Sequence, residues 1–346
     1  MNKKLVLLAT DRYSININDF YMFYRRTGHQ IEALVHHTNC PGKKWWAEGR
    51  FPDPAREKLL DPLDLDRLKL VPYTEPDEVP GLLDGLDFDY VCMGNGNAEE
   101  HRRVVDHIGI DRCLFTEYGW LPWSKNFYIS RGGCGVRSEI RDVDAATLDR
   151  QPLREAEVEG FRRTLSKGWP VLRRGFVYVP LQKDVNDFKF TFCNFQNNVE
   201  FLDFIHGIVP PGMRIVVKEH PLYRQHYDYA KYGRGRFTDI SDKKLNKAML
   251  YRNMAAMICI NSTSILEALA FGGKVFAYGE DLYMNKDLVH FRVTDSSEFE
   301  RLLGMDQSRE RCDRFISLLM ERQVDRRRCL TEDRDYIEGH YWNRAI

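Results

Sequence analysis

Short apolar runs alternate with helical stretches along most of the chain, and this alternation constrains the fold more than any other feature of the sequence. Apolar runs without polar interruption are typical of strands that are buried on both faces of a parallel sheet. The pattern therefore predicts an α/β fold. Strands are expected over 5–9, 31–36, 89–93, 113–116, 176–180, 213–218, 257–260 and 274–278, and helices over 17–26, 98–107, 199–208 and 308–322.

The alternation is interrupted once, by a highly charged segment over 141–172, and then starts again. The length of 346 residues is enough for two domains, each with its own core. We therefore expect two Rossmann-like domains that face a cleft, residues 1–165 and residues 166–346. Ligands of such domains bind beyond the carboxyl ends of the strands, which is where the polar motifs of this chain fall.

The charges balance, with 51 Lys plus Arg against 51 Asp plus Glu, so the chain has no overall field that would attract nucleic acid. The eight cysteines form no CxxC or zinc-knuckle spacing, and we expect reduced, buried thiols, no bound metal and no cofactor. The first apolar run, over 5–9, is too short for a signal peptide or a membrane span. We therefore expect a soluble cytoplasmic protein.

Asn261-Ser262-Thr263 follows a predicted strand and opens a predicted helix. Ser264 and Glu267 have the spacing of a capping box, which marks the start of that helix. Hydroxyl groups and free N–H groups at a helix start form a phosphate site. The alternative is that the hydroxyl residues are only caps and turn formers.

Lys218-Glu219-His220-Pro221, with Arg224 nearby, lies just past another predicted strand. The two cations are suited to neutralising a phosphate, and His220 is suited to protonating a leaving group. The alternative is an ordinary charged surface turn.

Glu117, Gly119 and Trp120 lie at the end of the predicted strand over 113–116. Glu117 is a candidate general base for an acceptor hydroxyl, and Gly119 permits a tight turn or the close approach of a sugar. Trp120 offers a ring for stacking on a sugar. The alternative is an acidic turn beside core tryptophans. The nearby turn over 94–97 lacks the GxGxxG spacing of a dinucleotide site.

Gln182 follows the predicted strand over 176–180 and precedes Asp184 and Asp187. Either carboxylate is a candidate nucleophile at an anomeric carbon, and the alternative is a pair of turn formers or helix caps. Glu280 follows the last predicted strand and is a candidate ligand for ribose hydroxyls, or a solvated acidic residue.

Together these motifs resemble the retaining β-Kdo transferases of bacterial capsule and O-antigen synthesis, in the capsule polysaccharide biosynthesis family. The shared motifs are Glu117-Tyr118-Gly119, Val179-Pro180-Leu181-Gln182 with a following Asp, Lys218-Glu219-His220-Pro221, and Asn261-Ser262-Thr263 leading to Glu267. The resemblance implies a GT-B-like glycosyltransferase that takes an acidic sugar from a CMP donor, with Kdo as the leading candidate. It also implies that the reaction needs no metal. The family often has two acidic residues before the glycine, and here Tyr118 takes the second place.

The resemblance also implies roles for these residues. Glu117 is the general acid or base for the acceptor, and Asp187, slightly favoured over Asp184, is the nucleophile. The implied CMP-binding residues are Lys218, His220, Pro221, Asn261, Ser262, Thr263 and Glu280, with His220 also catalytic; the implied sugar or acceptor contacts are Gly119, Trp120, Gln182 and Arg224.

The expected partners are a CMP-activated acidic sugar and a glycan or glycolipid acceptor. Any attachment to the inner membrane or to a polysaccharide assembly complex is expected to be peripheral. Three alternatives stay open: an inverting CMP-sialic-acid-type transferase, a CMP-alditol phosphotransferase, and a non-enzymatic module that binds a nucleotide sugar or a glycan. The first two need no Asp nucleophile, and the third tolerates the loss of Glu117.

Overall fold

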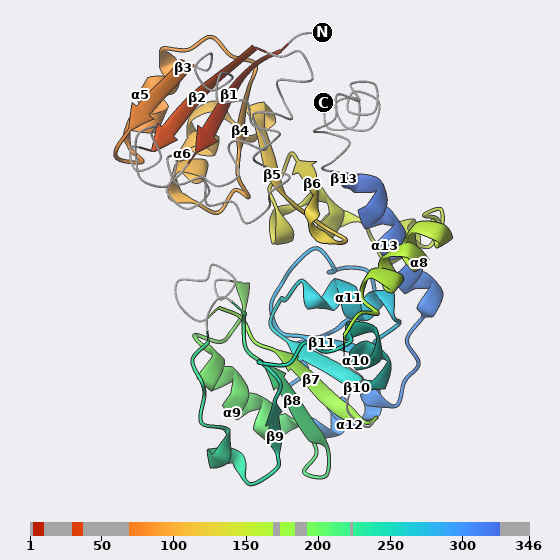
Figure 1. Cartoon of the computed structure of the whole chain (residues 1–346). Coiled ribbons are helices and arrows are strands. Elements are labelled where there is room, and N and C mark those ends of the chain that lie inside the picture. The colour runs from red at the N-terminus through yellow and green to blue at the C-terminus, as the bar shows by residue number, and fades with distance from the viewer. Residues whose placement is uncertain are drawn as a thin grey trace. The chain divides into compact units, whose positions relative to one another are not determined.

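The computed structural model describes residues 3–9, 30–36, 69–168, 174–183, 192–221 and 224–325. These residues divide into two compact units (Figure 1). The first unit contains the described residues up to Gly119, Trp123–Glu139 and residues 323–325, and the second contains Trp120–Pro122 and Ile140–Arg322. The division expected from the sequence, at residue 165, differs in that 140–165 group with the second unit and the chain returns to the first unit at residue 323.

The first unit is built on a sheet whose described strands have the order β13-β6-β5-β4-β1-β2-β3 (Figure 1). Five neighbouring strands, in the spatial order β3-β2-β1-β4-β5, pair in parallel, which is the order 3-2-1-4-5 of a Rossmann fold. Its strands are β1 (Lys4–Ala9), β2 (Gln30–His36), β3 (Lys69–Tyr73), β4 (Tyr90–Met93), β5 (Cys113–Trp120), β6 (Trp123–Ser130) and β13 (Val324–Asp325), and its described α-helices are α5 (Glu78–Asp84) and α6 (Glu99–Ile108).

The second unit contains a parallel sheet with the order β12-β11-β10-β7-β8-β9 among the described residues. Counted from its own first strand, this is the Rossmann order 3-2-1-4-5-6. The strands are β7 (Phe176–Pro180), β8 (Arg214–Lys218), β9 (Phe237–Asp239), β10 (Met254–Cys259), β11 (Val275–Ala277) and β12 (His290–Phe291). The described helices are α7 (Ala145–Leu148), α8 (Glu155–Thr164), α9 (Asn198–Ile208), α10 (Lys247–Asn253), α11 (Ser264–Ala270), α12 (Ser296–Leu303) and α13 (Arg309–Arg322).

The core of the second unit follows from the apolar runs of the sequence. All five residues of β7 are buried, because helices cover both faces of a parallel sheet. Helix α9 begins where the Asn197 side chain accepts a hydrogen bond from the N–H of Glu200, and it turns Phe201 and Ile205 into the core. Full burial of each such side chain stabilises the fold by about 1.5–3 kcal/mol.

The expected α/β fold with two Rossmann-like domains is confirmed, and the cleft expected between them stays a prediction. The helix expected over 17–26 lies outside the described residues. In the part of the chain that is described, no helix is long and apolar enough to cross a membrane. The six cysteines within that part form no disulfide, and five of them are buried.

Candidate functional site

The polar motifs of the second unit lie at one edge of its sheet. All its strand pairs are parallel, so every strand ends at the same edge, and we name this the carboxyl edge. In spatial order, β11 is followed by Glu280, β10 by Asn261 and Ser262, β7 by Gln182, and β8 by His220. The structure thus brings together four segments that are far apart in the sequence.

Gln182 takes the central place at this edge. Strand β7 lies between β8 and β10, so the segments of His220 and Ser262 are two strand spacings apart, which is about 10 Å. The two motifs therefore flank Gln182.

The side-chain amide of Gln182 is buried, with 5% of the residue exposed, and its Nε2 has no hydrogen-bond partner among the described residues. Its backbone carbonyl accepts a bond of 2.8 Å from the Asn198 amide, so the backbone is held in place. A buried donor without a partner costs about 1–3 kcal/mol, and such groups need an explanation. A ligand oxygen at the carboxyl edge would provide the missing acceptor. Asp184 and Asp187 lie outside the described residues.

Lys218 ends β8 inside a cluster of charges. Burial lowers the pKa of Lys218, and the nearby Lys247 lowers it further, while Glu267 opposes the shift. Arg224 also lies close enough to lower this pKa, and it is held by an ion pair with Asp242 and by a 2.8 Å hydrogen bond to a backbone carbonyl. Lys247 is paired with Glu267 and Arg224 with Asp242, so Lys218 is the cation at this end of the edge that is placed to meet an anion.

Glu219, to which sequence reasoning assigned no role, organises the loop that follows β8. Its carboxylate is 2% exposed. One oxygen accepts bonds of 2.7 and 3.1 Å from the N–H groups of Gln225 and His226. The other oxygen accepts bonds of 3.2 and 3.1 Å from the Tyr227 N–H and the Tyr229 hydroxyl. The loop that carries Arg224 is therefore closed around Glu219, beside half-buried His220 and exposed Pro221.

The hydroxyl motif has a different local structure from the one expected. The prediction of a capping box formed by Ser264 and Glu267 is wrong, because the Glu267 carboxylate instead accepts bonds of 2.7 and 2.9 Å from Lys247 Nζ. It also accepts a 2.5 Å bond from the Tyr251 hydroxyl. Helix α11 begins after Thr263, whose side chain makes no capping bond and is exposed.

Within the same motif, the half-buried Ser262 hydroxyl accepts a 3.2 Å bond from the Ser264 N–H. The hydroxyl hydrogen of Ser262 is still available for donation. Asn261 is 2% exposed, and its amide donates to the backbone carbonyl of Glu280 at 3.5 Å. That contact joins the ends of β10 and β11.

Glu280 is held by two arginines of the second unit. Its carboxylate accepts a 2.7 Å bond from Arg141, and its other oxygen lies 3.7 Å from Arg292. Sequence reasoning missed both arginines, because they are 139 and 12 residues away along the chain. The contact of Glu280 with ribose hydroxyls stays a prediction.

Glu117 lies inside β5 and not after it, because β5 extends through Trp120. The parallel pairing with β4 ends at Met93 and Phe115, so Glu117 projects past the end of β4. Its carboxylate accepts a 3.2 Å bond from the Asn95 amide and a 2.9 Å bond from the Tyr118 N–H. The turn over 94–97, which sequence reasoning set aside, thus holds the proposed acid–base residue in place.

Gly119 has a structural requirement of its own. A Cβ at this position would lie 2.5 Å from Asn126 Cβ on β6, so only glycine fits beside that strand. Trp120 is 7% exposed, which leaves little of the ring for a sugar. Contacts of both residues with an acceptor stay predictions. Across the described ranges, no group of three or more His, Cys, Asp and Glu residues is placed to hold a metal ion.

Comparisons with known proteins agree with this architecture. Residues 173–296 match the family model of the capsule polysaccharide biosynthesis protein, which confirms the resemblance inferred from the motifs. The β-Kdo 2,7 transferase of Thermosulfurimonas dismutans KpsC has a similar fold, with a TM-score of 0.51 and 16% identity over 82% of this chain and 96% of that chain. The β-Kdo 2,4 transferase of the same KpsC gives 0.46 and 15% identity over 77% of this chain and 88% of that chain. No curated protein sequence matches the chain.

Proposed function

We propose that this chain, whose residues 173–296 match the family model of the capsule polysaccharide biosynthesis protein, transfers an acidic sugar from a CMP donor to a glycan acceptor of a bacterial surface polysaccharide, with Kdo as the leading candidate sugar. The observation that supports this most is the position of Gln182. Its buried amide lacks an acceptor among the described residues, and it lies between the His220 and Ser262 segments. An oxygen-rich donor sugar phosphate provides acceptors at that place.

The cations of the carboxyl edge supply the charge that the leaving group needs. Lys218, with His220 beside it, neutralises the phosphate of CMP from the β8 side. The Ser262 hydroxyl donates to the same phosphate from the β10 side. Because these groups stabilise the departing CMP, the reaction is proposed to need no metal.

The proposed reaction proceeds in two displacements. A carboxylate oxygen of Asp187 or Asp184 bonds to the anomeric carbon while the bond from that carbon to the phosphate oxygen breaks, and the electron pair leaves with CMP. The acceptor hydroxyl oxygen then displaces the Asp, and its proton passes to Glu117. The two inversions give net retention.

The first test is transfer itself. Purified protein is incubated with CMP-Kdo and a Kdo-terminated glycan acceptor, and CMP release and the elongated glycan are measured. Wild-type protein and the Glu99→Gln control, which alters an exposed carboxylate of the same unit, are expected to be active. Glu117→Gln is expected to lose transfer. Tight CMP binding without turnover would contradict the proposed enzymatic function and favour a non-enzymatic binding module.

The second test concerns the nucleophile. Glu117→Gln incubated with CMP-Kdo is expected to carry one covalent Kdo on Asp187 or Asp184, detected by intact-mass and peptide-mass analysis. The matching Ala variant loses the adduct. Transfer with both aspartates replaced would refute retention and favour the inverting alternative, and turnover of a CMP-alditol alone would favour the phosphotransferase.

The third test separates a binding role of Gln182 from a packing role. Gln182→Met removes the buried amide while keeping a side chain of similar length. Without ligand, this variant is expected to be as stable as wild type or more stable, because a buried unpaired donor is lost. Its affinity for the donor, measured by calorimetry, is expected to fall. A loss of stability with unchanged donor affinity would overturn the assignment.

A further inference from the structure

A buried asparagine connects two segments of the carboxyl edge. Asn198 is the first residue of α9, and it is 1% exposed. Its side-chain NH2 group donates to the backbone carbonyl of Gln182 at 2.8 Å and to the Tyr227 hydroxyl at 3.1 Å. An amide nitrogen carries two hydrogens, and these two bonds use both of them. Asn198 therefore joins the segment that follows β7 to the loop that follows β8.

The bond from Asn198 restricts the direction in which the Gln182 side chain leaves the main chain. On the amino side of Gln182, the N–H of Leu181 donates to the backbone carbonyl of Lys218 at 2.9 Å. On the carboxyl side, the carbonyl of Gln182 itself is held by Asn198. The orientation of a carbonyl sets the ψ angle of its residue, and φ and ψ decide which side-chain rotamers are allowed. Without Asn198, the amide of Gln182 can turn away from the edge.

The second bond keeps the Asn198 amide from rotating. It is made to Tyr227, whose ring packs against the core of the second unit. The N–H of Tyr227 donates to the buried carboxylate of Glu219 at 3.2 Å, so the main chain of this residue is held as well. A rotation of the Asn198 amide away from Gln182 would also break the bond to Tyr227.

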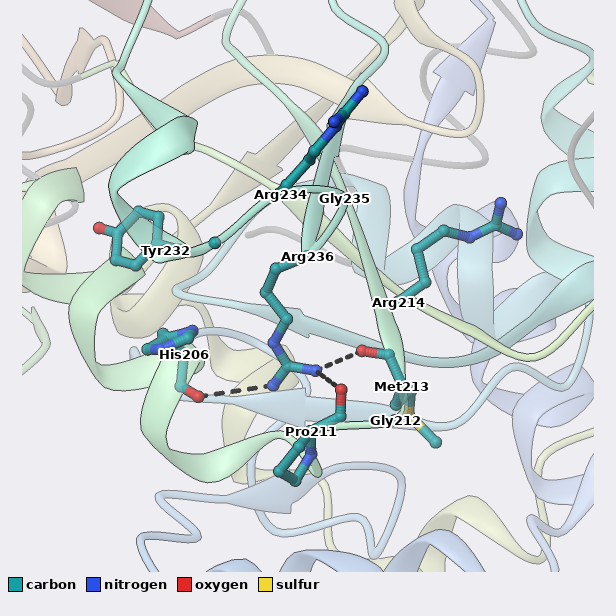
Figure 2. Close-up of a pocket in the computed structure, with 10 residues that line it drawn as sticks. His206, Pro211, Gly212, Met213, Arg214, Tyr232, Arg234, Gly235 and Arg236 are labelled. Atoms are coloured by element: carbon teal, nitrogen blue, oxygen red, sulfur yellow. Dashed lines mark hydrogen bonds between the residues drawn. The ribbon is translucent and has the colours of Figure 1, made fainter.

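Helix α9 gives Asn198 a rigid base. The Asn197 side chain caps the start of the helix, and apolar side chains along it are buried in the core. Past the end of the helix, the Arg236 guanidinium donates to the backbone carbonyls of Pro211 at 3.1 Å and Met213 at 2.5 Å (Figure 2). The helix is thus fixed at both ends, and a side chain on a rigid element holds its target more precisely than one on a loop.

We propose that Asn198 is a positioning residue of the donor site, which aims the buried amide of Gln182 at an oxygen of the CMP-activated sugar. This inference rests on the proposed function, in which Gln182 contacts the donor. Both amide hydrogens of Asn198 are used inside the protein, so Asn198 acts on the donor through Gln182. Replacing Asn198 is therefore expected to matter only while Gln182 is present.

The test is a double-mutant cycle on kcat/KM for CMP-Kdo in the transfer assay. Asn198→Leu removes both donated bonds with a side chain of similar volume. It is expected to lower kcat/KM about tenfold, because a hydrogen bond to a charged ligand is lost or misaligned. In the Gln182→Met background, the same substitution is expected to lower kcat/KM by less than about twofold. An equal loss in both backgrounds would overturn the proposal and leave Asn198 with a structural role.

A second measurement does not depend on turnover. In protein labelled with ¹⁵N in its glutamine side chains, the NH2 signals of Gln182 are identified by their loss in Gln182→Met. Asn198→Leu is expected to shift these signals and to speed their exchange with water. Tyr227→Phe removes the other acceptor of the same NH2 group and is expected to leave them close to wild type. Unchanged signals in Asn198→Leu, or equal shifts in both variants, would overturn the proposal.

Two further variants complete the design. Asn198→Ser, which fits in the same space and is too short to reach both acceptors, replaces Asn198→Leu in both measurements if that variant fails to fold. Gln307→Leu is the control, because the Gln307 amide also donates to a backbone carbonyl, that of Leu288, at 3.2 Å. Leu288 comes just before β12 and so lies toward the opposite edge of the sheet. Gln307→Leu is expected to match wild type in kcat/KM and in the Gln182 signals.

The two proposals fail separately. CMP-Kdo turnover by wild-type protein, with equal losses in both backgrounds of the cycle, would remove the role of Asn198 and leave the proposed function standing. Gln182 signals that depend on Asn198, in a protein that neither binds CMP nor releases it from CMP-Kdo, would do the reverse.

Discussion

Replacing Glu219 by glutamine changes one buried oxygen into an NH2 group at the centre of the loop that follows β8. The carboxylate accepts four hydrogen bonds, two on each oxygen, from three N–H groups and the Tyr229 hydroxyl. An amide keeps one acceptor oxygen, so at least one N–H group then faces donor hydrogens, and the bonds that remain are no longer made to a charged group. The variant has nearly the same volume, so any loss of stability comes from these bonds and not from a cavity.

The magnitude follows from the number of bonds. A hydrogen bond to a charged group contributes about 1.5–3 kcal/mol and a neutral one about 0.5–1.5 kcal/mol, so losing one bond and the charge from the other three is expected to cost the loop about 3–6 kcal/mol. Tyr229→Phe removes only the bond from the hydroxyl, at 3.1 Å, and is expected to cost less than half as much. Glu200→Gln is the matched control, because the Glu200 side chain is exposed at the start of α9.

The assay is amide hydrogen exchange read by mass spectrometry, with urea unfolding alongside. Exchange resolves local opening, which matters because a loop can open without global unfolding. The amides of Gln225, His226 and Tyr227 are expected to exchange at least tenfold faster in Glu219→Gln. CMP affinity is expected to fall as well, because Arg224 and His220 lie in the loop and beside it. Exchange rates at these amides equal to those of wild type would refute the account of Glu219.

Three further expectations follow from single contacts. Gly119→Ala is expected to lower the free energy of unfolding by about 1–3 kcal/mol, because the added methyl group overlaps with Asn126. Gly207→Ala lies in open space on α9 and is expected to raise the free energy of unfolding by about 0.5–1 kcal/mol. Both are measured by urea unfolding, and shifts of the same sign would contradict this expectation. Because burial first of all lowers the pKa of Lys218 below its ordinary 10.5, CMP affinity is expected to decline as the pH rises through this lowered pKa. The unfolded chain then binds more protons at Lys218, so its contribution to the free energy of unfolding rises with pH over the same window. Lys218→Arg keeps its charge and should hold CMP to higher pH, and identical calorimetric pH profiles would count against this. Lys286 is fully buried and donates to three backbone carbonyls at 3.1, 2.8 and 2.8 Å. Lys286→Met is therefore expected to lower the free energy of unfolding, measured in urea, by about 2–5 kcal/mol. The control Lys244→Met, at an exposed position, is expected to leave it unchanged.

Much of the fold was readable from local pattern. The strand expected over 176–180 is β7, with the same bounds. A strand that is buried on both faces is a continuous run of apolar residues, and such a run can be recognised from the local sequence alone. The strands at 31–36, 213–218 and 257–260 were likewise found to within three residues as β2, β8 and β10. Placing polar motifs after these strands was enough to predict that they share an edge.

Other elements carry no local signal. Strand β13 has two residues, Val324 and Asp325, and it exists only because it pairs with β6. Pairing with a partner distant in the chain is a property of the fold, and short strands contain too few residues to show a period.

The sequence thus determined which residues lie at the carboxyl edge, because the end of a strand and the turn that follows it are marked by neighbouring residues in the chain. What each side chain touches was decided by the tertiary structure. Glu267 has the spacing of a cap and instead binds Lys247 and Tyr251 of α10, and Glu219 looked like a surface charge and is buried under its own loop. A charged side chain binds whichever partner the fold brings nearest, and its neighbours in the chain do not reveal that partner.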